Sequence, residues 1–194
     1  MAILSNTSKM PGKSFSLPAT QCNVGSKLAK QKGTVCFKCY ALRGNYLWPN
    51  VKNAMAKRLE MIKHPNWVDI MVREISRTRE KHFRWHDSGD LQSLDHLEKI
   101  VEIAKRLPEY KFWIPSKEYH LLRQYDGDIP DNLIIRMSSA KIDGKPLKGF
   151  ALTSTVHTVK AYGKQCEANT RKGKCGDCRM CWDKNIPNIS YPYH

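Results

Sequence analysis

His82-Phe-Arg-Trp-His-Asp-Ser-Gly-Asp90 leads into an amphipathic segment, residues 94–107, and then into Lys111-Phe-Trp-Ile114. The two aromatic-rich ends predict β-strands, and the apolar spacing between them predicts a helix that Ser93 caps. A strand, a helix and a second strand predict a right-handed crossover between parallel strands. This stretch therefore predicts an α/β fold.

The sequence on the C-terminal side continues the alternation of predicted strands and helices. We expect the 194 residues to form a single domain. About four strands are too few for an eight-stranded barrel. We therefore expect a small partial, TIM-like barrel or a compact parallel sheet over residues 51–160, between a loop-rich basic segment (1–50) and a loop-rich, cysteine-bearing one (161–194). The further predicted elements are helices over 51–62, behind Asn66 and over 119–124, and strands over 133–137 and 149–153.

Polar side chains follow each predicted strand, where parallel α/β folds place their ligand sites. His86, Asp87 and Asp90 are the predicted catalytic residues, because carboxylates and an imidazole at a strand end suit acid–base or hard-metal chemistry. Lys117-Glu118 and Ser138 follow the next two strands, and Lys117 and Ser138 would line a cofactor pocket. Each group also has an ordinary structural interpretation: a capped turn, a surface ion pair, or strand-end turn chemistry.

The chain carries a formal charge of +15, and all of the excess lies towards its two ends. Residues 1–59 contain ten basic and no acidic residues, residues 141–194 carry +6, and the middle carries −1. All seven cysteines lie in the same two end segments. A basic segment is commonly a solvated face or a surface for polyanions. Here we expect part of it to offset anionic metal–thiolate groups as well.

Four cysteines near the C-terminus have the spacing of a metal centre. The last three, Cys175, Cys178 and Cys181, are each separated by two residues. Bacterial ferredoxins use a run with this spacing to hold three corners of a cubane cluster. A [4Fe–4S] cluster is the first interpretation. Structural zinc is the second, because four thiolates also suit zinc, and unligated thiols are the third. The predicted ligands are Cys166, Cys175, Cys178 and Cys181.

Three further cysteines, Cys22, Cys36 and Cys39, have no local fourth partner. Three thiolates suit a cluster with one open iron. Alternatively, Cys22 is an ordinary buried thiol, or the three share a metal with a C-terminal cysteine. The chain is thus expected to hold one or two clusters.

Cys36-Phe-Lys-Cys39-Tyr40-Ala41, behind the upstream Cys22, has the form C…C-x-x-C-Y-A. With Ser5–Met10, Ser14–Ala19 and Phe83–Asp90, this stretch resembles a phage family called gene product eighty-eight, with radical-SAM-like features. The resemblance runs over most of the chain, including the C-terminal cysteine run. It implies a phage origin, a TIM-like partial barrel and iron–sulfur binding, but no particular substrate.

In radical-SAM enzymes three cysteines hold a cubane, S-adenosylmethionine chelates its fourth iron, and a Gly-Gly-Glu-like turn binds the methionine amine. By this resemblance, the three N-terminal cysteines would hold the reactive cluster, and Ser88, Gly89 and Asp90 would bind the cofactor. Thirteen residues separate Cys22 from Cys36 here, whereas three separate the first two cysteines of radical-SAM enzymes. The acidic residue of the turn is Asp90 rather than a glutamate.

Three functions follow from these features. The first is an iron–sulfur enzyme that acts on a nucleic acid or nucleotide and takes electrons from a reductase. The second is a metal-stabilised nucleic-acid-binding protein without turnover, in which Trp48 and Trp182 are the candidate stacking residues. The third is an electron-transfer protein. With no apolar run near the roughly 18 residues of a membrane span, we expect the protein in the host cytoplasm; the sequence predicts no oligomeric state.

Overall fold

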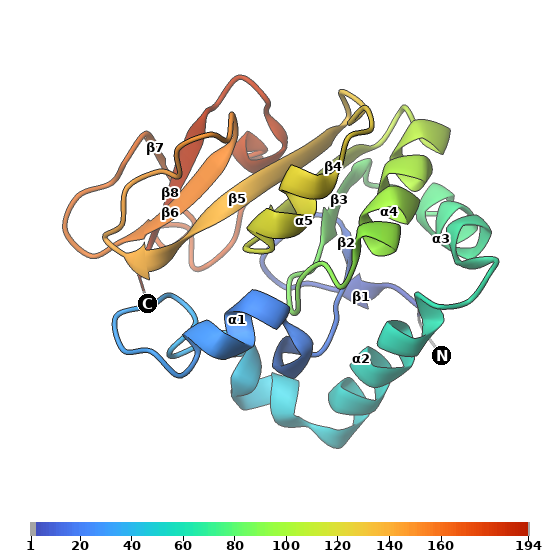
Figure 1. The fold of residues 1–194 in the computed structure, drawn as a ribbon, viewed down its shortest axis with the longest axis horizontal. Helices are drawn as coiled ribbons and strands as arrows, with labels where there is room; N and C mark the ends of the chain where they lie inside the picture. The colour runs from blue at the N-terminus through green and yellow to red at the C-terminus, as the bar shows by residue number, and fades with distance from the viewer. Residues whose placement is uncertain (1–2, 194) are drawn as a thin grey trace.

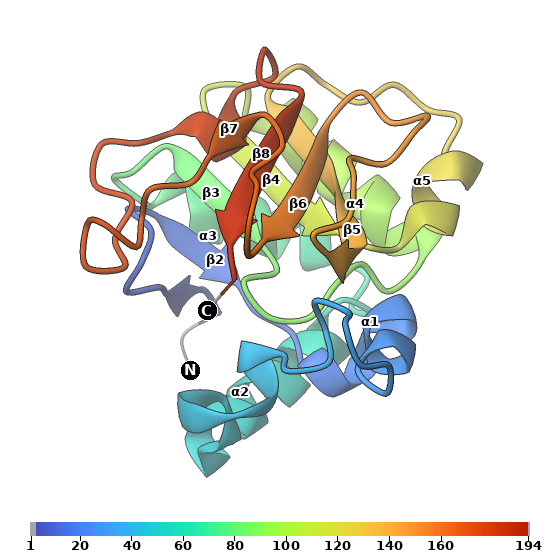
Figure 2. The same ribbon diagram turned by 90° about the vertical axis from the view of Figure 1, so that its left-hand side faces the viewer.

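A computed structural model describes residues 3–193, which form an open, curved sheet with helices packed against it (Figures 1 and 2). Within these residues the strand order is β1-β2-β3-β4-β5-β6-β8-β7, and only β1 and β2 pair antiparallel. The predicted α/β class is confirmed. The strands are β1 (Ser5–Asn6), β2 (Lys13–Phe15), β3 (His82–Trp85), β4 (Lys111–Ser116), β5 (Leu133–Ile142), β6 (Thr153–His157), β7 (Lys164–Gln165) and β8 (Asn188–Pro192).

Helices α3, α4 and α5 cover one face of the sheet, whereas α1 and α2 lie beyond the carboxyl ends of its strands (Figures 1 and 2). None of the helices within residues 3–193 has the length and apolar character needed to cross a membrane. The helices are α1 (Asn23–Leu28), α2 (Pro49–Met61), α3 (Trp67–Ser76), α4 (Leu94–Arg106) and α5 (Tyr119–Gln124), with short 3-10 turns at Ala19–Gln21, Tyr40–Leu42, Gly44–Leu47 and Met180–Trp182.

Alternation along β3 divides its side chains between the two faces of the sheet. Phe83 and Trp85 are buried in the core under the helices. Arg84 points the other way, with its guanidinium carbon 4.6 Å from the centre of the Trp113 ring. The crossover helix α4 begins as predicted, because the Ser93 hydroxyl accepts the His96 N–H at 3.1 Å.

The C-terminal segment contributes Trp182 to the second face of the sheet. Trp182 packs with Met10, Trp113 and Ile134 in a separate apolar cluster. Its indole N–H donates to the Phe83 carbonyl at 2.9 Å, and only 5% of the residue is exposed. The expectation that Trp182 stacks on nucleic-acid bases is therefore wrong, because both its ring and its donor are already engaged.

Two strand boundaries differ from the predicted ones. The strand expected at 149–153 lies at 153–157 instead, because Gly149 takes a left-handed turn with φ 79°. β5 continues to Ile142 because it pairs with β6, so Ser138 lies within a strand rather than after it. Both end segments are loop-rich as expected, yet each also adds short strands to the sheet.

Candidate functional site

Three thiols of the N-terminal segment converge near the carboxyl ends of β3 and β4. A Cβ on Gly25 would lie 3.5 Å from Cys22 Sγ and 3.7 Å from Cys36 Sγ, so both sulfurs border this glycine. The third thiol follows a tight turn in which Cys39 N–H donates to Cys36 O at 3.1 Å. Burial raises the pKa of Cys22 far above its usual value, and Asp90, Cys39 and Cys36 raise it further. We call these three cysteines the N-terminal thiol set.

Asp90 links the ends of two neighbouring strands beside these thiols. One carboxylate oxygen accepts the Leu91 N–H at 2.8 Å, and the other accepts the Lys117 N–H at 2.9 Å. Burial raises the pKa of Asp90 to about 6, and Glu118 adds to this rise. The predicted cofactor residues Asp90 and Lys117 are therefore brought together, as expected for consecutive parallel strands.

Glu118 is the site residue that sequence reasoning missed, because its neighbour Lys117 suggested a surface ion pair. Glu118 is completely buried, and its Oε1 accepts the Val24 N–H of α1 at 3.0 Å. Its Oε2 has no hydrogen-bond partner, and the half-exposed His120 imidazole lies 3.9 Å away. A buried carboxylate oxygen without a donor is costly and marks a place for a cationic group. Its position after a strand was the available signal.

Lys117 and Ser138 border the N-terminal thiol set in different ways. Burial raises the pKa of Cys36, and the nearby Lys117 ammonium opposes that rise. Ser138 reaches the site through Tyr119, whose hydroxyl donates to the Ser138 carbonyl at 2.8 Å. Burial raises the pKa of Tyr119 to about 12, with Cys36 also contributing. The Ser138 hydroxyl itself shares a hydrogen bond of 2.9 Å with the Ser154 hydroxyl.

Asp87 anchors the N-terminal segment to β3. Its carboxylate accepts hydrogen bonds from the hydroxyls of Ser14 and Ser16, and from Tyr46 at 3.0 Å. Its main-chain carbonyl accepts the Tyr40 hydroxyl. Most of its polar capacity is thus used to join β2 and the turn after Cys39 to the end of β3.

His86 lies behind the site, against the helix layer. Its ring centre is 5.3 Å from that of His96 and 6.2 Å from that of Trp85, and neither ring nitrogen has a hydrogen-bond partner. Burial lowers the pKa of His86 to about 3, and Arg84 adds to this effect. His86 is therefore a neutral, core-facing imidazole in this arrangement.

Ser88 and Gly89 hold the turn after β3 against the exit of β2. The Ser88 hydroxyl donates to the Leu17 carbonyl at 2.8 Å, and Leu17 N–H donates back to the Ser88 carbonyl at 2.8 Å. Gly89 has φ 83°, and a Cβ there would lie 2.5 Å from Leu17 Cβ. Only glycine fits this close approach, which places Asp90 beside the thiols.

The other four cysteines share a second neighbourhood, which we call the C-terminal thiol set. Cys175 N–H donates to Lys9 O at 2.9 Å, and the Cys181 thiol lies 3.1 Å from the Tyr191 hydroxyl. Burial raises the pKa of Cys175, and Cys166 and Cys178 add to the rise. Burial likewise raises the pKa of Cys181 to about 11. The set is Cys166, Cys175, Cys178 and Cys181.

Buried Arg136 holds the chain that carries the C-terminal thiol set. Its guanidinium donates to the carbonyls of Cys181 (3.1 Å), Asp183 (2.6 Å), Ile186 (2.7 Å) and Met180 (3.3 Å). The charge within the predicted strand 133–137 was the signal for this role, since a buried arginine needs several acceptors.

The two thiol sets lie in separate parts of the molecule. The segment around α1 lies beyond the carboxyl ends of the strands, whereas the chain between β7 and β8 runs beside the opposite face from the helices (Figure 2). Among residues 3–193, no three His, Cys, Asp or Glu side chains are close enough to hold a single metal ion. Each set could still supply thiolates to a centre with several metal atoms, which spreads its ligands more widely.

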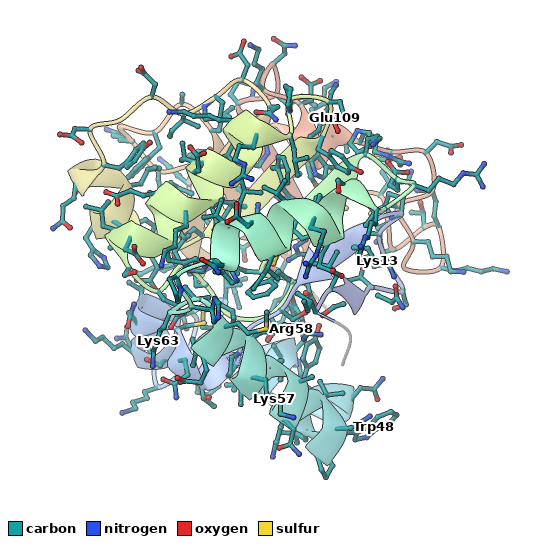
Figure 3. The ribbon with its side chains drawn as sticks, turned by 90° about the vertical axis from the view of Figure 1, so that its right-hand side faces the viewer. Lys13, Trp48, Lys57, Arg58, Lys63 and Glu109 are labelled. Atoms are coloured by element: carbon teal, nitrogen blue, oxygen red, sulfur yellow. The ribbon has the colours of Figure 1, made fainter. Side chains whose placement is uncertain are left out.

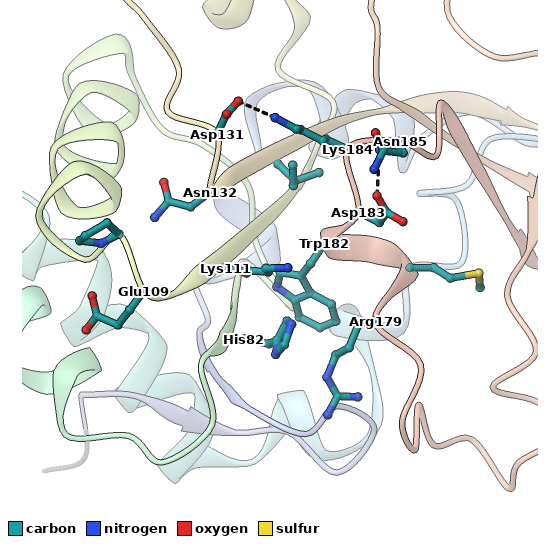
Figure 4. Close-up of a pocket in the computed structure, with 13 residues that line it drawn as sticks. His82, Glu109, Lys111, Asp131, Asn132, Arg179, Trp182, Asp183, Lys184 and Asn185 are labelled. Atoms are coloured by element: carbon teal, nitrogen blue, oxygen red, sulfur yellow. Dashed lines mark hydrogen bonds and ion pairs between the residues drawn. The ribbon is translucent and has the colours of Figure 1, made fainter.

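A cavity of about 730 Å³ opens at the amino ends of β3, β4 and β5, away from the N-terminal thiol set (Figure 4). His82, Lys111 and Trp182 line it, with ring centres of His82 and Trp182 5.4 Å apart. Lys184 pairs across its rim with Asp131 at 2.8 Å. Ligand sites of parallel α/β folds lie at the other edge of the sheet.

Comparison with known proteins supports the resemblance for the larger part of the chain. No curated protein and no solved structure matches the sequence. The family model of gene product 88 matches residues 2–156. This range contains the N-terminal thiol set and every residue from His86 to Ser138 discussed above, but it ends before the C-terminal thiol set. The chain belongs to the gene product 88 family, as its resemblance to that phage family predicted.

Proposed function

We propose that this protein is an iron–sulfur protein with a radical-SAM-like centre at the N-terminal thiol set. The observation that supports it best is the convergence of three thiols beside Asp90 and the unpartnered oxygen of Glu118. Three thiolates leave one iron of a cubane open for a ligand. The proposal also assigns a second cluster to the C-terminal thiol set.

The residues around the N-terminal thiol set fit S-adenosylmethionine as the ligand of that open iron. A reduced cluster, when bound, would supply the electron that cleaves this cofactor. Glu118 and Asp90 would hold its ammonium group, because a buried carboxylate oxygen without a donor favours a cation. Lys117 would face its carboxylate, and Ser88 and Gly89 would fix the turn that carries Asp90. Asp87 would keep the loop after Cys39 closed over the site.

The substrate that we propose is a nucleic acid or nucleotide, and the electrons would come from a reductase. Residues 1–59 carry +10 around the same thiols, which favours an anionic partner at this edge. Two clusters would lower the net charge by only about three, since cubanes with three and four thiolates carry about −1 and −2. Most of the surplus positive charge would remain.

The second candidate is a nucleic-acid-binding protein that uses metal only for stability, with zinc in place of iron. The C-terminal thiol set favours this alternative for its own centre, because Cys175 and Cys181 pack against an apolar cluster that includes Trp182. Four thiolates would fill the coordination sphere of a structural zinc ion and leave no open position. This candidate predicts tight nucleic-acid binding and no turnover.

Anaerobic purification separates these candidates. We expect a brown protein that contains iron and sulfide, and 5′-deoxyadenosine after addition of dithionite and S-adenosylmethionine. Cys36→Ser should remove about half of the iron and abolish cleavage of S-adenosylmethionine. Cys178→Ser should remove only the iron of the C-terminal thiol set. A colourless zinc protein would contradict the proposal, and loss of all iron in either variant would indicate one shared centre.

A further inference from the structure

Exposed aromatic and apolar side chains are concentrated in the segment of the sequence that carries Cys36 and Cys39. Eight large side chains of this kind are exposed in residues 3–193, and five of them lie between residues 37 and 48. Trp48 is 56% exposed, whereas each of the other four tryptophans is at most 5% exposed. Figure 3 shows Trp48 at the end of α2 that lies farthest from the sheet. The five exposed residues are Phe37, Tyr40, Leu42, Leu47 and Trp48.

The same segment and the start of α2 are strongly basic. Lys38, Arg43, Lys52 and Lys57 are exposed between or beside the aromatic residues. Within residues 3–193, none of these four cations forms an ion pair, and the first acidic residue of the chain is Glu60. Lys57 lies on α2, the helix that follows Trp48 (Figure 3). Their charge is thus left for a partner outside the chain. We call residues 37–57 the basic aromatic surface.

We propose that the basic aromatic surface binds single-stranded nucleic acid, with a base stacked on Trp48 and phosphates on the neighbouring cations. Flat exposed rings among unpaired cations are what unpaired bases and a phosphate backbone require together. A duplex hides its base faces, and an acidic protein would be held by charge without stacking. Phe37 and Tyr40 flank Cys36 and Cys39 in the sequence, so the bound strand passes the thiols. This placement rests on the proposed function; the binding itself does not.

Tryptophan fluorescence tests the inference directly, because Trp48 is the one tryptophan among residues 3–193 that solvent reaches freely. Titration with an oligothymidylate should quench part of the emission, whereas inorganic polyphosphate should bind without the same quenching. Trp48→Ala should weaken oligonucleotide binding about tenfold or more and remove the quenching. Paired Lys52→Gln and Lys57→Gln should lower the salt dependence of binding by roughly one to two units of slope.

A matched control lies on another part of the surface. Val159 and Lys160 are exposed neighbours, so Val159→Ala with Lys160→Gln removes an apolar and a basic side chain elsewhere. This variant should bind like the original protein. Equal losses in both variants, unchanged affinity in Trp48→Ala, or quenching by polyphosphate would overturn the inference. Tighter binding of duplex than of single strand, or of an acidic protein only, would also overturn it.

Measurements on the Cys36→Ser variant keep the two proposals apart. Loss of the N-terminal iron with oligonucleotide binding intact would support a surface that binds without the cluster. Iron retained in Trp48→Ala with binding lost is the expected result. If the original protein contains iron but does not bind the oligonucleotide, the surface is wrong and the iron–sulfur centre stands.

Discussion

The two thiol sets lie in environments of opposite character. The C-terminal thiol set lies beside the sheet face opposite the helices, where Arg136 donates to four carbonyls of the surrounding chain and Tyr191 contacts one thiol. The N-terminal thiol set lies at an edge, next to the unpartnered Oε2 of Glu118 and the basic aromatic surface. A buried polar group without a partner calls for an explanation, and a ligand that completes it is one such explanation.

From this contrast we expect the C-terminal thiol set to maintain the structure and the N-terminal thiol set to bind a ligand. The family model covers only the N-terminal thiol set. The following predictions test the division, beginning with the side that should tolerate least change.

Arg136→Met should destabilise the protein by about 3–5 kcal/mol, because it leaves buried carbonyls without a donor. Urea unfolding monitored by fluorescence measures this loss. Arg123→Met, an exposed arginine on α5, is the matched control and should change stability by less than about 0.5 kcal/mol. An equal effect of the two substitutions would mean that the C-terminal segment is not held by Arg136.

Asp87→Asn should cost about 2 kcal/mol, because an amide accepts fewer of the three hydroxyl hydrogen bonds. Tyr46→Phe, which removes one of these donors, should cost about 1 kcal/mol. Urea unfolding measures both, with the exposed Tyr193→Phe as control. A stable Asp87→Asn protein that has lost activity would indicate a catalytic role for Asp87 instead of an anchoring one.

Acid should destabilise the helix layer behind the N-terminal thiol set. Burial lowers the pKa of His86 to about 3 and that of His96 well below its usual value. Below about pH 6.5 the unfolded chain therefore binds more protons, and stability falls by about 1.4 kcal/mol per pH unit for each histidine. Between pH 6 and 5, His96→Gln should remove the contribution of one histidine to this dependence of unfolding free energy on pH. His64→Gln, which changes an exposed histidine, should leave the dependence unchanged. An unchanged slope in His96→Gln would refute this account.

The sequence predicted the parts of the fold that depend on local periodicity. β3, α4, β4 and α5 were recognisable because their apolar spacing and the Ser93 cap are local signals. β1, β2 and β7 are only two or three residues long and form through pairing with distant strands, so no local pattern marks them.

The candidate site divides in the same way. Cysteine spacing indicated both thiol sets. The burial of Glu118 depends on Val24, 94 residues away, and the role of Arg136 on carbonyls 44 to 50 residues away. Contacts of this range follow from the tertiary fold, and the neighbouring sequence shows only the position of Glu118 after a strand and the charge of Arg136 within one, not the partners of either residue.

Glu118→Gln should give a change as small as that of Tyr46→Phe, and of opposite sign. Removal of a buried charge that has one unpartnered oxygen and lies near Asp90 and Cys22 should stabilise the metal-free protein by about 1 kcal/mol. Thermal unfolding of metal-free protein measures this gain, with the exposed Glu98→Gln on α4 as control.

The same Glu118→Gln variant should keep its iron but lose most of the spectral change caused by S-adenosylmethionine, because the cationic group then loses one of its two carboxylate partners. A substitution that stabilises the protein but removes its function indicates that the original residue is kept for a ligand. If Glu118→Gln instead weakens folding and leaves the cofactor response intact, Glu118 serves only to fasten α1 through the Val24 amide. The N-terminal thiol set would then be as structural as the C-terminal one.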